Sequence, residues 1–353
     1  MLVIPPIQIT DARLTSTTIP EEVAPTYAGG TTYANGAFAG LVSVYGSPQI
    51  VWRSLQDSNT GNAQTEGYWW AGVGTVYPIY ASGSSCGIGG IVTDLATHSL
   101  YESLVVSNTG NALTNIEKWK YIGKTNRFKM FDYDRNQRAV SPNSMTFVLT
   151  IGKRINSIAL KGIIANSYSL SVTSVSGGGE VYSSSGTLNT RITTTWSDYF
   201  YGEFTTRESL VFFDIPFYSD GIITINLSAT SGNVGLSTAA TGTFVDVGET
   251  LQNATSDILN FSQVSRDLDG NAILTPARNI PKSRQQTITP KTNINKIIQL
   301  REELNGKSGV WFGLSDPVDG YFEAASILGF YRGFEIDMSQ AGSAVINIEL
   351  EEV

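Results

Sequence analysis

The stretch VVSNTGNALTNIEKWKYIG, residues 105–123, decides the fold because part of it is written twice in the chain. The hexapeptide SNTGNA starts at Ser58 and again at Ser107, an offset of 49 residues. Over the 23 positions around each hexapeptide, an ungapped alignment at this offset gives 11 identities. A duplication this dense predicts two tandem modules of one fold, at about residues 31–80 and 81–131.

Each copy predicts a short strand, an Asn-Thr-Gly-Asn turn and a second strand that carries a tryptophan. The turn residues are Asn59 and Gly61 in the first copy, and Asn108 and Gly110 in the second. Glycine at this place predicts a backbone with positive φ, which a Cβ atom would disfavour. The repeated motif therefore predicts a structural turn.

Aromatic residues separate what the two copies share from what they do not. Trp70 and Trp119 are equivalent and predict the core of each module, because one large ring fills most of so small a core. Beside them, Tyr68 and Trp69 of the first copy are replaced by charged residues in the second, which predicts that they are exposed. An exposed ring can stack on a sugar, or can simply lie at an interface without a ligand. The candidate glycan-binding residues are Tyr68, Trp69, Trp52 and Tyr101.

Composition and patterning place the chain in the mostly β class. It has 353 residues with 35 glycines, 16 tyrosines and 15 phenylalanines, a composition typical of strands and turns. From Met145 onward, segments such as MTFVLTIG and GIITINLSA alternate apolar with polar residues. We expect two small tandem β modules followed by a β-sandwich domain with one α-helix, the sandwich spanning residues 140–353 and completed by the last strands.

Three further segments are predicted outside the repeats. TNINKIIQLREELNG has a helical apolar stripe that ends at a glycine, and it predicts a helix at about 293–305. The polar, turn-rich segment at about 249–290 predicts an inserted arm, either a long ordered connection or a contact with a partner. The proline-containing residues 1–30 predict an extended N-terminal arm that adds a strand to a neighbour's sheet.

Charge and rare residues exclude several classes of function. The chain has 31 acidic against 23 basic residues, so it lacks the basic field that nucleic-acid binding requires. Cys86 and His98 are single representatives of their types, which excludes a disulfide framework and a Cys/His zinc site within one chain. His98 predicts a surface or capping residue. The sequence shows no signal peptide and no apolar run that could span a membrane, so we expect a product of the cytoplasm.

Candidate catalytic and metal-binding residues are weak. FDYD places Asp132 and Asp134 on one face of a predicted strand, where a glycosidase pair is one interpretation and a solvated face is the favoured one. The run RDLDGN offers Asp267, Asp269 and Asn271 as cation ligands, yet the Glu that a calcium loop needs further on is missing, and an ordinary turn is favoured. We therefore expect no catalytic residues, no metal and no cofactor.

Three stretches resemble known families. YESLVVSNTGNALTNIEKWKYIG, from Tyr101, resembles small carbohydrate-binding modules of the chitin-binding type. WKYIGKTNRFKMFD, Trp119 to Asp132, is similar to a signature of tail proteins from tailed bacteriophages. SILGFYRGFEIDMS, Ser326 to Ser339, resembles the final domain of those proteins. The resemblance implies a structural protein of the tail tip or baseplate that contains carbohydrate-binding-module-like repeats.

The resemblance sets our expectation of function. It implies a non-enzymatic virion component, made in the host cytoplasm and oligomeric in the tail, that docks other tail, baseplate or fibre subunits. Its repeats would either hold those subunits or touch host-surface polysaccharide. Two alternatives stay open, a freestanding glycan-binding lectin and a polysaccharide depolymerase that uses Asp132 and Asp134.

Overall fold

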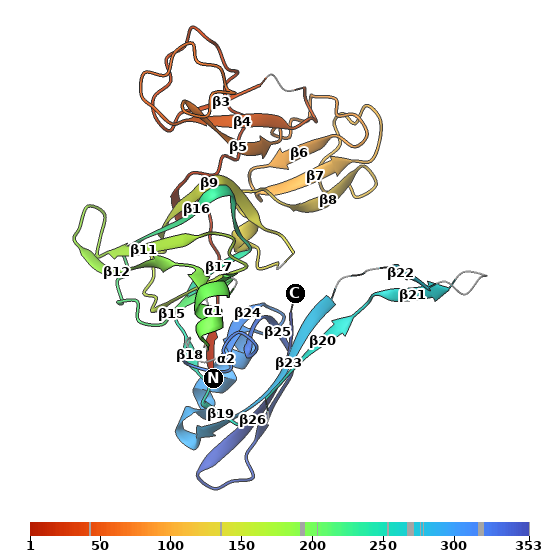
Figure 1. Cartoon of the computed structure of the whole chain (residues 1–353). Helices are drawn as coiled ribbons and strands as arrows, with labels where there is room; N and C mark the ends of the chain where they lie inside the picture. Colours follow the sequence, from red (N-terminus) through yellow and green to blue (C-terminus); the bar gives the residue numbers. More distant parts are fainter. Residues whose placement is uncertain are drawn as a thin grey trace.

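The chain is mostly β, as predicted, and its parts follow one another down the molecule (Figure 1). Two small modules lie at one end, a sandwich lies in the middle and a curled sheet with a helix lies at the other end. Among the described residues, no helix is both long and apolar enough to cross a membrane. The computed structural model describes residues 1–41, 44–134, 136–190, 195–202, 204–252, 254–266, 272–275, 277, 279–316 and 321–352.

Each repeat folds as a three-stranded antiparallel sheet, which confirms the tandem duplication. The same turn joins the second and third strands of both sheets. The first module contains β3 (Phe38–Gly40), β4 (Gln49–Ser54) and β5 (Trp70–Val76), and the second contains β6 (Ile91–Asp94), β7 (Ser99–Ser103) and β8 (Trp119–Lys124).

The sandwich consists of a five-stranded sheet packed on a three-stranded sheet. The first sheet has the order β12 (Glu180–Thr187), β11 (Ser167–Thr173), β16 (Ile222–Leu236), β9 (Ala139–Thr150) and β2 (Leu14–Thr17). The second has the order β15 (Ser209–Phe212), β10 (Ser157–Lys161) and β17 (Thr238–Gly242). The alternation in these strands places one apolar face of each sheet in a shared core.

Strand β10 is buried on both faces, which explains its short, nearly continuous apolar run. Ile158 and Leu160 point into the sandwich core. Ala159 points the other way, where it packs with Ala240 of β17 against the curled sheet. Small side chains at these two positions let the two sheets approach closely, so the sandwich and the curled sheet share an apolar interface.

The expectation that the last strands complete the sandwich is wrong. These strands form a separate, curled sheet. The segment 245–250 joins the two edges of this sheet. Its first two residues pair with the edge strand at residues 2–4, and its last two pair with the opposite edge strand at residues 279–290. The sheet is therefore curled into a barrel. The strand order is β18 (Val245–Asp246), β1 (Leu2–Ile4), β24 (Gly309–Phe312), β25 (Ser326–Asp337), β26 (Ser343–Glu352), β23 (Asn279–Pro290) and β19 (Glu249–Thr250).

The predicted helix is present and covers one face of the curled sheet that forms the barrel. It consists of a 3₁₀ turn, η2 (Lys291–Asn293), followed by α2 (Ile294–Glu303). Ile297 and Leu300 pack with Trp311 of β24, which is fully buried. Gly306 follows the helix with a φ of +68°, as expected of a glycine that ends a helix.

The N-terminal segment belongs to this chain's own sheets, so the expectation that it adds to a neighbour's sheet is wrong. Strand β1 lies between β18 and β24, and both Val3 and Ile4 are fully buried. Strand β2 then pairs with β9 of the sandwich. The first 30 residues therefore run from the barrel past the sandwich to the first module (Figure 1).

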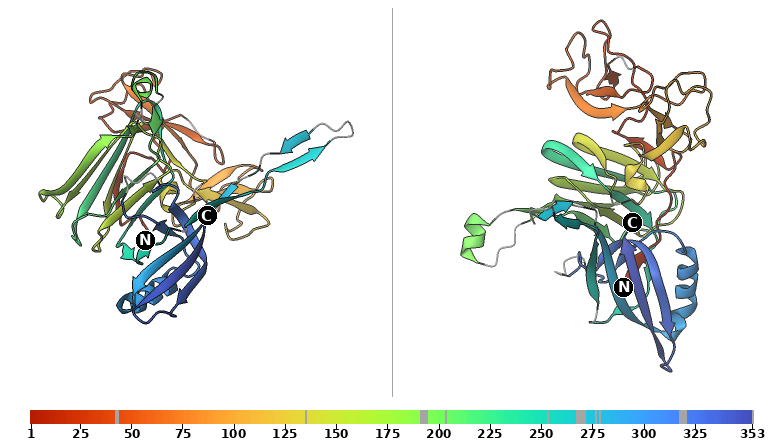
Figure 2. Two further views of the ribbon diagram at one scale, coloured as in Figure 1. Left: turned by 60° about the horizontal axis from the view of Figure 1, so that its bottom comes forward. Right: turned by 90° about the vertical axis from the view of Figure 1, so that its right-hand side faces the viewer.

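Two elements project from the body. The predicted arm is a long hairpin, in which β20 (Thr255–Asn260) pairs with β23, and β21 (Gln263–Arg266) pairs with β22 (Ala272–Thr275) beyond it (Figure 2, left). A short helix that the sequence analysis did not predict, α1 (Trp196–Tyr201), lies at the end of a second projection (Figure 2, right). Strands β13 (Asn189–Thr190) and β14 (Thr205–Thr206) pair at its base.

Candidate functional site

The asparagine of the repeated turn holds each module together. Asn59 is fully buried, and its Nδ2 donates to Ser54 Oγ at 3.0 Å and to the Trp69 carbonyl at 3.3 Å. Its Oδ1 accepts from Asn62 Nδ2 at 2.9 Å. Asn108 repeats all three hydrogen bonds in the second module, with distances of 2.8 to 3.1 Å. The repeated residues therefore satisfy buried polar groups, as a structural turn requires.

Positive φ angles confirm the predicted role of the two turn glycines. Gly61 has a φ of +77° and Gly110 a φ of +75°. The serine that begins the hexapeptide also has positive φ in both copies, +57° at Ser58 and +52° at Ser107. This pair of left-handed positions fixes the turn and explains why SNTGNA is kept twice.

The shared tryptophan forms the module core, as predicted. Trp70 and Trp119 are each 3% exposed. In the first module, Trp70 Nε1 and Tyr27 Oη both donate to the Asn62 carbonyl, at 3.0 and 2.8 Å. Trp119 and Tyr80 make the same two hydrogen bonds to the Asn111 carbonyl.

These contacts shift the module boundaries. Tyr27 belongs to the first module although it was assigned to the arm at 1–30, and Tyr80 belongs to the second although it was assigned to the end of the first.

One tyrosine of the first module completes the core of the second. In the first module, Tyr33 Oη accepts a hydrogen bond from Ala28 N at 2.9 Å. The equivalent residue in the second module is Cys86, which cannot make this bond. Tyr45, from the first module, takes the place, and its Oη accepts from Ala81 N at 2.8 Å. The second module therefore depends on a side chain of the first.

Because the shared residues serve the scaffold, the positions at which the modules differ are the candidates for binding. Tyr68 is 70% exposed, and its ring meets Trp69 edge to face at 5.4 Å. Trp69 is half-buried and packs with Trp52 against the module core, so the expectation that Trp69 is exposed is wrong in part. One exposed ring beside two half-exposed rings offers flat apolar faces of the kind that stack on sugars.

The second module presents a more polar face at the equivalent place. Tyr101 meets Tyr121 edge to face at 5.8 Å, and Tyr121 is 52% exposed. Desolvation raises the pKa of the Tyr121 hydroxyl, and the nearby Asp132 carboxylate and Tyr101 hydroxyl raise it further. The positions equivalent to Tyr68 and Trp69 carry the charged Glu117 and Lys118. This face therefore suits ring stacking less well than that of the first module.

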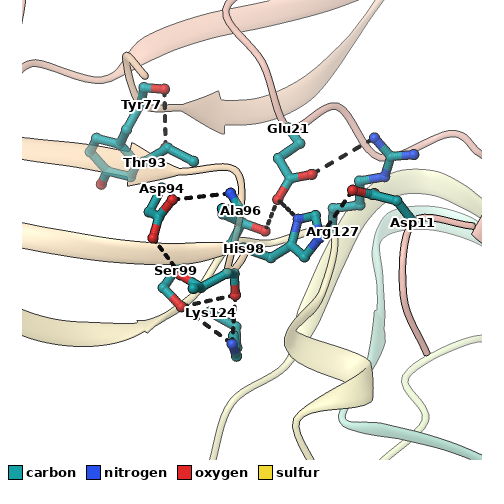
Figure 3. A network of polar contacts seen from close by, with 12 residues as sticks. Asp11, Glu21, Tyr77, Thr93, Asp94, Ala96, His98, Ser99, Lys124 and Arg127 are labelled. Carbon is teal, nitrogen blue, oxygen red and sulfur yellow. Dashed lines mark hydrogen bonds and ion pairs between the residues drawn. The ribbon is translucent and has the colours of Figure 1, made fainter. Parts of the chain in front are cut away.

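The expectation that His98 is a surface residue is wrong. His98 lies between the second module and the sandwich (Figure 3). Its side chain is 14% exposed and stacks on Phe128 at a centroid distance of 3.6 Å. Its Nδ1 lies 3.0 Å from Glu21 Oε1, and its Nε2 lies 3.2 Å from Asp11 Oδ2. Arg127 faces the other oxygen of Glu21 at 3.8 Å.

This cluster fits a bridge better than a metal site. Asp11, Glu21 and His98 bring carboxylate and imidazole atoms within 4.8 Å of one another. The Asp11 carboxylate, however, faces Nε2 of the ring and the Glu21 carboxylate faces Nδ1. Because an imidazole binds a metal ion through one nitrogen only, the two carboxylates do not converge on the same metal position. The arrangement instead ties the segment that carries Asp11 and Glu21 to the second module.

Asp132 and Asp134 do not lie on a strand, so the predicted strand, on which both the favoured solvated face and the alternative glycosidase pair depended, is wrong. They follow the 3₁₀ turn η1 (Lys129–Phe131), and Tyr133 between them has a φ of +59°. Asp134 N donates to Asp132 Oδ1 at 3.0 Å, which makes this a local turn. Desolvation and the nearby Asp134 raise the pKa of Asp132 to about 6, although that hydrogen bond opposes the shift.

The cation candidates Asp267, Asp269 and Asn271 lie outside the described residues and stay a prediction.

Sequence reasoning missed two groups of exposed side chains. The projecting hairpin exposes Ile258, Phe261, Val264 and Leu274, each more than half exposed. Helix α1 exposes a group of aromatic rings. A signal for α1 was present, because Thr195 followed three residues later by Asp198 is a capping box.

Comparison with known proteins adds no assignment, since no family model matches the chain and no curated protein is detectably similar to it.

Proposed function

We propose that this chain is a non-enzymatic structural protein of a bacteriophage virion, at the tail tip or baseplate, that docks neighbouring tail or fibre subunits. The observation that carries the proposal is the projecting hairpin. Its outer part has a cross-strand pair, Val264 opposite Leu274, with each side chain 63% exposed. Ile258 and Phe261 nearer the body are 54% and 53% exposed.

Such a hairpin is costly for a chain that stays alone. A two-stranded ribbon is marginally stable by itself, and exposed apolar pairs on a strand edge favour association. A partner that covers Val264 and Leu274 would bury this apolar surface and order the ribbon. The acidic, glycine-rich chain with its duplicated modules at the far end then resembles an assembly subunit more than a catalyst.

Aspartate at the exposed pair tests the assembly role. In the variant Val264→Asp/Leu274→Asp, we expect self-association of the purified chain to weaken at least about tenfold, because like charges would be buried at the contact. Analytical ultracentrifugation over a range of concentrations measures this. The matched control is Gln263→Asp/Thr275→Asp, the neighbouring cross-strand pair, which is also exposed. The virion assignment is checked by mass spectrometry of purified particles of the virus that encodes the chain.

Two results would count against this role. One is a wild-type chain that is monomeric at every concentration and absent from the particles. The other is an aspartate variant that assembles as well as the wild type, which would place the contact elsewhere.

A second candidate function is contact with host-surface polysaccharide through the first module. The observation that favours it is the group of Tyr68, Trp69 and Trp52, because Tyr68 and Trp69 are replaced by charged residues in the second module. The same surface would serve a freestanding lectin. Binding without assembly would favour that alternative.

Removing the first module's rings tests the glycan contact. For Tyr68→Ala/Trp69→Ala, we expect affinity for host polysaccharide to fall by roughly tenfold to a hundredfold, since each stacked ring contributes about 1 kcal/mol or more. Isothermal titration with polysaccharide from candidate hosts measures it. The matched control is Glu117→Ala/Lys118→Ala, at the equivalent positions of the second module. Equal loss in both variants would show that the rings do not form the site.

A further inference from the structure

One histidine ring contributes to the attachment of the second module to the sandwich (Figure 3). His98 ends the turn between β6 and β7 and has a φ of +53°, a left-handed conformation that few residues other than glycine adopt. Its ring stacks on Phe128, which belongs to the sandwich core. The ring therefore lies between two parts of the chain, and its contacts hold one against the other.

Both nitrogens of this ring face a carboxylate. Nδ1 lies 3.0 Å from Glu21 Oε1, and Nε2 lies 3.2 Å from Asp11 Oδ2. An ionised carboxylate can only accept hydrogen bonds, so each contact needs an N–H group on the ring. A neutral imidazole has one N–H group, and only the imidazolium has two. The two contacts are therefore both hydrogen bonds only when the ring is protonated.

The two carboxylates differ in what remains to them when the ring is neutral. Glu21 is buried, accepts from Thr125 Oγ1 at 2.5 Å and faces Arg127 at 3.8 Å. The Asp11 side chain is 64% exposed, so water can solvate it. A buried carboxylate loses more than an exposed one when a donor is removed. The remaining N–H group of a neutral ring therefore stays with Glu21, and the contact with Asp11 is lost.

Two further charged groups border the ring. Lys124 of β8 donates to the Thr97 carbonyl at 2.6 Å, and Asp132 lines the same cleft as His98 and Asp11. Desolvation raises the pKa of Asp132 to about 6. An acid whose pKa is raised by folding stabilises the folded state below that pKa and less above it. Asp132 would therefore act in the same direction as His98, and a test must separate the two.

We propose that His98 is a pH-sensitive clamp, which holds the second module to the sandwich in mildly acidic solution and loosens as the ring loses its proton. Imidazole ordinarily changes charge between about pH 5 and 8, whereas ordinary carboxylates are mostly ionised above about pH 5. Both contacts are therefore made near pH 5.5, and the contact with Asp11 is lost near pH 8. The second module then gains freedom to reorient on the sandwich.

Hydrogen exchange of the full-length chain at pH 5.5 and 8.0 tests the proposal. After correction for the pH dependence of intrinsic exchange, protection of residues 8–22 and 124–131 should be about five- to tenfold lower at pH 8.0, since a charge-assisted hydrogen bond is lost. Peptides from β10 and β11 should not change. His98 is the only histidine of the chain, so its ring signals in NMR need no assignment. Protection should fall over the same pH interval in which the ring loses its proton.

Three variants assign the effect. His98→Asn tolerates the left-handed backbone and does not titrate, so protection should be low at both pH values. Asp11→Asn should remove more than about half of the pH difference, because an amide pairs with Nε2 in either protonation state. Asp132→Asn is the control and should keep the difference.

Three results would overturn the proposal. The first is equal wild-type protection at both pH values. The second is a difference that survives in His98→Asn. The third is a difference that disappears in Asp132→Asn, which would assign the pH response to that carboxyl group.

Discussion

Val3→Asp should unfold the barrel. Val3 is fully buried between β18 and β24, and it packs in the cluster that includes Trp311 and Ile348. The substitution removes a buried apolar side chain and places a carboxylate where water cannot reach it, so we expect a loss of more than about 4 kcal/mol in unfolding free energy. Urea denaturation followed by amide exchange in β23 and β26 measures the change.

Gln8→Asp is the matched control for Val3→Asp, because it adds the same charge to the same segment at an exposed position. We expect it to change stability by less than about 0.5 kcal/mol. If Val3→Asp instead left the barrel stable and abolished self-association, the strand would pair with a neighbouring chain. That outcome would restore the idea of an exchanged N-terminal arm.

Local patterns in the sequence predicted local structure well. The repeated turn has the positive φ that its glycine indicated, and the equivalent tryptophans are buried. The predicted helix matches α2 closely, because its apolar stripe and Gly306 are local signals. The module boundaries failed for a simple reason. The offset is 53 residues through the first strand and becomes 49 only at the second, so Tyr27 and Tyr80 are equivalent in the structure but do not align in the ungapped repeat.

Contacts between distant segments could not be predicted. Leu2 pairs with Phe312, and nothing near either residue indicates its partner. The apolar stretch around Val3 fitted a neighbour's sheet as well as its own. His98 likewise meets Glu21, 77 residues away, so its role at the junction had no local signal. The exposure of the candidate binding residues was predicted in part. The comparison of the repeats predicted correctly that Tyr68 is exposed, but it could not show that Trp69 packs partly against the core.

The two modules should respond unequally to the same core substitution. Trp70→Ala should destabilise its own module by about 3–5 kcal/mol, since it empties most of a core that contains few other buried side chains. It should also weaken the second module, because Tyr45, which fills the place next to Cys86, is held by the first. Trp119→Ala should cost the second module a similar amount and leave the first intact, since the first has its own Tyr33.

Amide hydrogen exchange resolved by mass spectrometry distinguishes these outcomes module by module. For Trp119→Ala we expect lost protection in β6–β8 and normal protection in β3–β5; for Trp70→Ala we expect loss in both sheets. Tyr45→Phe isolates the coupling, because it removes the hydrogen bond to Ala81 and keeps the ring, and should cost the second module about 1 kcal/mol. Equal losses in both modules for both tryptophan variants would refute a one-way dependence. They would also mean that glycan variants of the first module act on the whole pair, since a cooperative pair unfolds as one unit.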